Sequence, residues 1–90
     1  MAATLPDVTI TNTAYTDLYD ATGIAVGTAV ILQNKGSQPV FLQTTLAAPS
    51  ASSEAGFVIS PLEILTVDAA EAGLWARSSA FSGHLSVQVN

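Results

Sequence analysis

The chain lacks cysteine and has very little charge, and each absence excludes a class of protein. Without cysteine there is no disulfide and no thiolate zinc site, so a domain of 90 residues depends on its core and on association for stability. Charged residues make up 10% of the sequence, against about 25% in an average soluble domain. Because interface cores are depleted of charge, this scarcity favours a surface that meets other protein. The alternative is a monomer covered by Ser and Thr.

Positive charge is the scarcest of all. Lys35 and Arg77 are the two strong cations, His84 is the single histidine, and the formal net charge is −5. Such a balance repels phosphate backbones, so we expect no nucleic acid partner. The opening MAATLPDVT lacks the positive and apolar segments of a secretion signal. The longest nearly apolar run, residues 24–32, is far shorter than the ~20 residues of a membrane helix, so we expect no membrane partner either.

Motifs for catalysis and for cofactor binding are also missing. The serines of residues 50–53 have no G-x-S-x-G elbow, and the one histidine has no evident residue to orient it as a base. Asp17 and Asp20 lack a third carboxylate at the spacing of a metal loop, and no phosphate-binding glycine loop occurs. The sequence therefore predicts a protein that is not an enzyme and that binds no cofactor and no metal.

What the chain does contain is a succession of short β-strand patterns separated by turn residues. Apolar and polar residues alternate at 8–11 and most cleanly at 85–90, and short apolar runs lie between them. Gly, Pro, Asn and Asp separate these runs. The pattern predicts one all-β domain over residues 1–90. We expect a small antiparallel β-sandwich or barrel, jelly-roll-like, with about 7–8 short strands.

The stretch FVISPLEILTVDAAEAGLWARS, residues 57–78, organises this prediction. It contains strand patterns on both sides of a Pro-centred turn, together with the only tryptophan and the only arginine, and we expect a hairpin-like unit. A similar succession at residues 30–46 predicts a second hairpin, and two hairpins stacked face to face make a sandwich. Residues 15–20 predict a further strand, with Tyr15 and Tyr19 on one face.

Two residues of this stretch are the most distinctive candidates for an interface. Trp75 and Arg77 share one face of a strand, and both residue types are enriched at binding hot spots. The alternative is a tryptophan at the edge of the core with the cation stacked over it. An acidic partner for Arg77 is expected from Asp68, Glu71 or another chain.

The N-terminal segment is the other candidate. Residues 1–12 form either a strand of this domain or an extended arm that adds to a neighbouring sheet. The complete set of interface candidates is Val8, Ile10, Tyr15, Tyr19, Trp75 and Arg77.

Two stretches, LYDATGIAVGTAVILQNKGSQPVFLQ and ISPLEILTVDAAEAGLWARSS, resemble small structural proteins of tailed bacteriophages. The similar features are a strand ending in QNKGS, a return beginning PVF, a Pro-centred turn before ILTV, and LWARS before a glycine turn. Pro61-Leu62 departs from the Pro-Gly turn of such proteins. The resemblance implies a capsid decoration (cement) protein that binds the outer surface of the major capsid protein lattice and stabilises the head.

The same resemblance implies a homo-oligomer, trimer or dimer, with no catalytic residues. It places the protein on the capsid exterior of the virion after assembly in the host cytoplasm. Two other functions stay open at this point. One is a head-tail, tail or baseplate component, and the other is a carbohydrate- or receptor-binding β-module that uses Tyr15, Tyr19 and Trp75 as stacking platforms.

Overall fold

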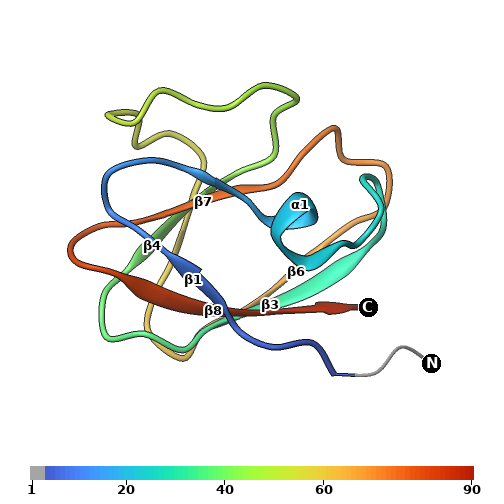
Figure 1. Cartoon of the computed structure of the whole chain (residues 1–90), viewed down its shortest axis with the longest axis horizontal. Helices are drawn as coiled ribbons and strands as arrows, with labels where there is room; N and C mark the ends of the chain where they lie inside the picture. Colours follow the sequence, from blue (N-terminus) through green and yellow to red (C-terminus); the bar gives the residue numbers. More distant parts are fainter. Residues whose placement is uncertain (1–3) are drawn as a thin grey trace.

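The computed structural model describes residues 4–90, which form eight short strands and one short helix (Figure 1). The elements are β1 (Val8–Ile10), β2 (Thr16–Asp17), α1 (Leu18–Thr22), β3 (Val30–Asn34), β4 (Val40–Gln43), β5 (Phe57–Ile59), β6 (Ile64–Val67), β7 (Trp75–Ser78) and β8 (Gly83–Val89). They make two four-stranded antiparallel sheets that pack as a sandwich and do not close into a barrel. The predicted all-β sandwich is confirmed.

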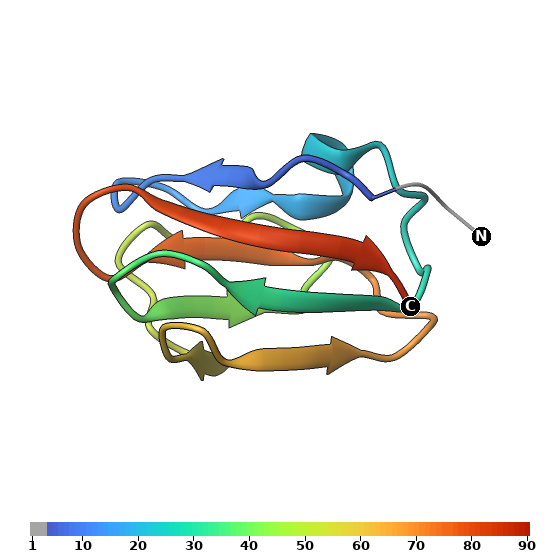
Figure 2. The same cartoon turned by 90° about the horizontal axis from the view of Figure 1, so that it is seen from below.

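The chain crosses between the two sheets at nearly every connection. The front sheet, nearer the viewer in Figure 2, has the order β1-β8-β3-β6, and the back sheet has the order β2-β7-β4-β5. This is the strand order of an eight-stranded jelly roll. The two predicted hairpins are wrong, because β3 and β4 lie in opposite sheets, as do β5 and β6. Turn residues show where a strand ends and not which strand it pairs with.

The core lies between the sheets and follows the period-2 alternation of the strands. The inward-facing apolar side chains that are almost fully buried are Ile10, Val30, Leu32, Val40, Leu42, Ile59, Leu74, Ala76, Leu85 and Val87. On β7, Ala76 and Ser78 face inward whereas Trp75 and Arg77 face outward, so the prediction that Trp75 and Arg77 share one face is confirmed.

Residues 15–20 do not form a single strand, which corrects the prediction. β2 ends at Asp17, whose side chain accepts a hydrogen bond from the backbone N–H of Asp20 at 3.2 Å and so caps α1. Gly23 ends the helix with a φ of 75°, a conformation that glycine adopts without a Cβ penalty. The turn that follows β2 therefore buries both Leu18 and Tyr19 against the sandwich, where a strand would have placed them on opposite faces.

A fully buried asparagine joins three segments at one end of the sandwich. The Nδ2 group of Asn34 donates to the carbonyl oxygens of Gln38 at 2.8 Å and Ile59 at 2.9 Å. Its Oδ1 atom accepts from the N–H of Gly36 at 3.0 Å, and its backbone carbonyl accepts from the N–H of Leu62. One residue of β3 thus fixes the β3–β4 turn, the end of β5 and the β5–β6 turn.

Candidate functional site

The two open sides of the sandwich differ in how they are covered. On one side, α1 lies against β1 and β2 and buries Leu18 and Tyr19 (Figure 2, upper edge). On the opposite side β5 and β6 form the edges of the back and front sheets, and no other helix or strand of residues 4–90 covers them (Figure 2, lower edge). Strand edges with free backbone groups are templates for pairing with another chain, so the uncovered side is the first place to look for a partner.

The two edge strands and the turn between them carry large apolar side chains that face water. Val58 lies on the outer face of the back sheet, opposite Phe41, and Ile64 lies on the outer face of the front sheet, opposite Gln33. Phe57 is 57% exposed, Val58 52%, Leu62 70% and Ile64 58%. We call these four residues the β5–β6 surface. Proteins that guard an edge strand against pairing place charges or proline within it, yet neither FVI of β5 nor ILTV of β6 contains either. The edge is therefore adhesive in both its side chains and its backbone.

Leu62 is held at the surface in an unfavourable backbone conformation. Its φ is 68°, in the left-handed region that costs a residue with a Cβ about 1 kcal/mol or more. The hydrogen bond from its N–H to the carbonyl of Asn34 stabilises this conformation. Leu62 therefore presents an apolar side chain at the tip of a turn, in a backbone conformation that glycine adopts at lower cost.

A groove opens where β5 and β6 separate, at the end away from the Ser60–Glu63 turn. Its cavity volume is about 180 Å³. The apolar residues that line it are Leu42, Phe57, Leu65 and Val67, and the acidic residues at its margin are Asp68 and Glu71. An apolar floor beside two carboxylates suits a ligand that is both apolar and positively charged.

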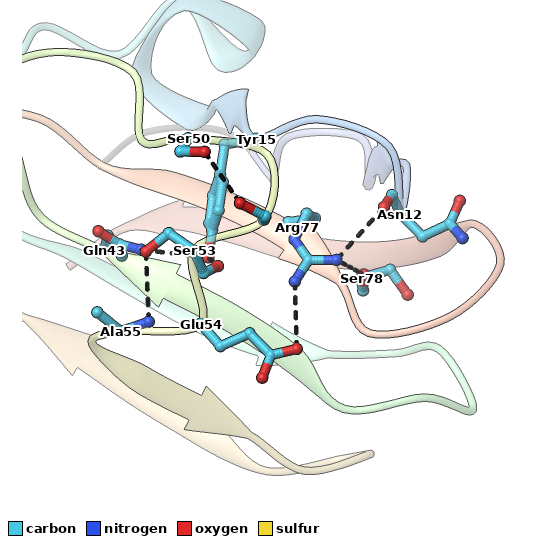
Figure 3. Close-up of polar contacts among 10 residues, drawn as sticks. Asn12, Tyr15, Gln43, Ser50, Ser53, Glu54, Ala55, Arg77 and Ser78 are labelled. Atoms are coloured by element: carbon cyan, nitrogen blue, oxygen red, sulfur yellow. Dashed lines mark hydrogen bonds and ion pairs between the residues drawn. The ribbon is translucent and has the colours of Figure 1, made fainter.

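The structure buries most of the Arg77 side chain instead of presenting it. Arg77 is 8% exposed, and its guanidinium carbon lies 4.9 Å from the ring centre of Phe41 and 5.7 Å from that of Tyr15. The alternative in which Arg77 stacks on Trp75 is wrong, because strand pairing places Phe41 opposite Arg77. The expected ion pair with Asp68 or Glu71 is also wrong. Arg77 pairs with Glu54, at 3.8 Å (Figure 3).

The loop of residues 44–56 supplies this partner because it folds over the outer face of the back sheet (Figure 3). The Tyr15 hydroxyl donates to the carbonyl of Ser53 at 2.6 Å, and the Gln43 amide donates to the Ser53 hydroxyl at 2.9 Å. The indole N–H of Trp75 donates to the carbonyl of Thr45 at 2.9 Å. Tyr15 and Trp75 therefore fasten a loop of their own chain.

Arg77→Ala is expected to lower the free energy of unfolding by about 2–3 kcal/mol, since it removes two ring contacts and the bond from Nη1 to the Asn12 carbonyl. Arg77→Met is expected to lower the free energy of unfolding by about 1 kcal/mol or less. Methionine fills the space, and the desolvated Nε, which has no hydrogen-bond partner among residues 4–90, disappears with its charge. Urea unfolding of both variants measures this difference; equal losses would contradict the packing role.

The N-terminal candidates belong to the domain's own sheet. Val8 and Ile10 are buried, and they pair with Leu85 and Gly83 of β8. The backbone N–H of Leu5 donates to the side-chain oxygen of Gln88 at 2.8 Å, and the side-chain NH2 of Gln88 donates to the Leu5 carbonyl at 3.0 Å. Of the two alternatives for this segment, residues 8–10 are a strand of this domain, and the first three residues lie outside the described part of the chain.

Tyr19 is 2% exposed, and its hydroxyl donates to the carbonyl of Thr28 at 2.9 Å. Burial raises the pKa of Tyr19 above its ordinary 10.0, the charge of Glu71 adds to the rise, and a backbone contact with Gly27 opposes it. The folded state therefore keeps its proton after the unfolded chain has begun to lose it, and stability falls as the pH rises above about 10.

Tyr19→Phe is expected to reduce this loss of stability at alkaline pH. At neutral pH it is expected to lower the free energy of unfolding by about 1 kcal/mol, because it removes the hydroxyl hydrogen bond. Melting temperatures of the two proteins between about pH 8 and about pH 11 provide the check. Parallel pH profiles for wild type and Tyr19→Phe would contradict the assignment.

The described residues contain no group of three or more His, Cys, Asp or Glu side chains placed to hold a metal ion. No helix within residues 4–90 is long and apolar enough to cross a membrane. No protein-family model, curated protein or solved structure matches the chain. A jelly roll hosts many functions, so the function must be argued from surfaces and contacts.

The β5–β6 surface was missed in the sequence, although a signal for it exists. In a strand with one buried face, apolar residues alternate with polar ones, whereas Phe57-Val58 and Ile64-Leu65 are consecutive apolar pairs. Such pairs place an apolar side chain on both faces of a strand. The six candidates chosen from the sequence lie elsewhere, and five of them, all but the half-buried Trp75, are buried in the monomer.

Proposed function

We propose that this chain is a capsid decoration protein of a tailed bacteriophage, which binds the outer surface of the major capsid protein lattice and stabilises the head. The observation that carries the proposal is the β5–β6 surface, an uncovered pair of charge-free strand edges with four exposed apolar side chains. A cement protein needs an adhesive surface on a rigid domain and no chemistry. The low charge of the whole sequence supports the same proposal.

The rest of the domain supports a passive, rigid role. Each sheet is cross-linked to loops by buried side chains, through Asn34 at one end and through Arg77 and Tyr15 on the outer face of the back sheet. A rigid domain loses little conformational entropy when it binds, which favours affinity from a small surface. The trimer or dimer implied by the resemblance remains part of the proposal, and light scattering of the purified protein measures it.

The two alternatives differ in what supports them. A head-tail, tail or baseplate component could use the same adhesive edge and would differ in copy number. A carbohydrate-binding module finds less support, because Tyr15 and Tyr19 are buried and the Trp75 indole is bonded within its own chain. Stacking on a sugar requires an exposed aromatic face.

The copy number in purified virions tests the proposal. Densitometry of a stained gel, calibrated with the purified protein, gives the ratio of this chain to the major capsid protein. We expect the number of copies of this chain to be comparable with the number of copies of the major capsid protein. A handful of copies per particle would overturn decoration in favour of the tail or connector assignment, and complete absence from virions would overturn both.

A further inference from the structure

Within residues 4–90, the Asp, Glu, Lys and Arg side chains that lack a partner of opposite sign are all acidic. Lys35 forms an ion pair with Asp7 at 2.9 Å, and Arg77 forms one with Glu54 at 3.8 Å. Within residues 4–90 no other Asp or Glu has a cationic side chain at ion-pair distance. Asp68 and Glu71, which border the β5–β6 groove, belong to this unpaired set. A partner that met the groove would find negative charge and no positive charge.

Three features of the groove together define the chemistry of its occupant. The floor is apolar, formed by Leu42, Leu65 and Val67, the margin holds two carboxylates, and the edge of β6 is unpaired along its length. Lysine and arginine combine an apolar stem with a charged head, so a stem can lie on the floor while the head reaches the carboxylates. An extended backbone can pair with the strand edge at the same time.

We propose that the groove binds an extended segment of a partner protein that carries lysine or arginine and that pairs with the free edge of β6. Asp68 directly follows β6, so a segment paired with β6 passes this carboxylate. This inference rests on the proposed function and deepens it by naming the chemistry of the segment on the capsid protein.

A second copy of this chain fits the groove less well. An isologous contact between two β6 edges is antiparallel, and in full overlap it places Asp68 of each copy opposite Glu63 of the other. The cations that could offset this repulsion are engaged elsewhere, and Arg77 is buried on the far face of the back sheet. Charge complementarity therefore favours a cationic partner over self-association.

The test uses the full chain and three blocked peptides of equal length, in which valine alternates with lysine, with glutamate or with serine. Amide signals of the labelled protein are followed by NMR during titration. We expect the valine-lysine peptide to bind most tightly and to shift the amides of residues 64–68. The glutamate peptide should not bind. The preference should weaken at high salt, because partly exposed charges are screened.

Asp68→Asn combined with Glu71→Gln is expected to weaken binding of the valine-lysine peptide by about tenfold. The matched control is Asp17→Asn combined with Asp20→Asn, which removes two charges beside α1 on the opposite side of the sandwich and keeps an N-cap of equal quality. This control should bind as the wild type does.

Several results would overturn the inference. They are equal binding of the lysine and glutamate peptides, shifts confined to other surfaces, no binding of any peptide, or an unchanged affinity of the Asp68/Glu71 variant. A dimer with the amides of residues 64–68 at its interface would assign the edge to a second copy instead.

Capsid co-sedimentation separates this inference from the proposed function. If the variant decorates capsids as the wild type does, the inference fails while decoration stands, and if the wild type does not decorate them, decoration fails.

Discussion

Replacing Asn34 by alanine is expected to lower the free energy of unfolding by about 3–4 kcal/mol, a large part of the stability of a domain this small. Asn34 is fully buried, and its side chain satisfies the carbonyls of Gln38 and Ile59 and the N–H of Gly36. Alanine leaves these groups without partners and opens a cavity between the β3–β4 turn and the end of β5. Urea or thermal unfolding measures the loss.

The matched control is Gln33→Ala on the same strand. Gln33 faces outward, and its side chain makes one hydrogen bond, to the carbonyl of Leu62 at 3.1 Å. We expect this change to cost about 0.5 kcal/mol, since water can replace the partner. A loss from Asn34→Ala no larger than that from Gln33→Ala would contradict the central role assigned to Asn34.

Val58→Lys combined with Ile64→Lys is expected to weaken binding to capsids by more than about 100-fold while the domain stays folded. Both positions are more than half exposed, so the lysine heads remain in water in the free protein. In a complex they would be buried without partners, and lysine on an edge strand opposes pairing with another strand. Co-sedimentation with capsids that lack the protein measures the binding.

The control for this variant places the same charges on the covered side of the sandwich. Thr9→Lys combined with Ala21→Lys adds two exposed lysines on β1 and α1, away from the β5–β6 surface. This control should bind capsids as the wild type does. Equal loss of binding in both variants would show that added charge alone weakens the contact. Undiminished binding of Val58→Lys/Ile64→Lys would exclude the β5–β6 surface as the site that contacts the capsid.

Local patterns in the sequence predicted the strands but not their partners. The alternation at β8, the apolar runs of β3 to β6 and the shared face of Trp75 and Arg77 depend on neighbouring residues, and the structure confirms them. The order β1-β8-β3-β6 depends on contacts between distant parts of the chain, for which a turn between strands carries no information. The hairpin hypothesis failed for this reason.

The site was harder to predict than the fold, because the polar contacts that decide exposure are also distant in sequence. Arg77 was expected to be available to a partner, yet Phe41, Tyr15 and Glu54 enclose it from three other segments. Tyr19 was assigned to a strand, whereas the side chain of Asp17 and the left-handed Gly23 make a helical turn that buries it. The consecutive apolar residues of β5 and β6 were present in the sequence and were interpreted only as strand patterns of a hairpin-like unit.

A three-dimensional reconstruction of the virion by electron cryomicroscopy shows which part of the particle this chain occupies and which of its edges makes the contact. We expect density for this jelly roll on the outer surface of the capsid, repeated over the lattice, with the β5–β6 edge against the major capsid protein. Density confined to the tail or connector would contradict decoration. Density on the capsid with β5 and β6 facing solvent would contradict the contact surface assigned to it.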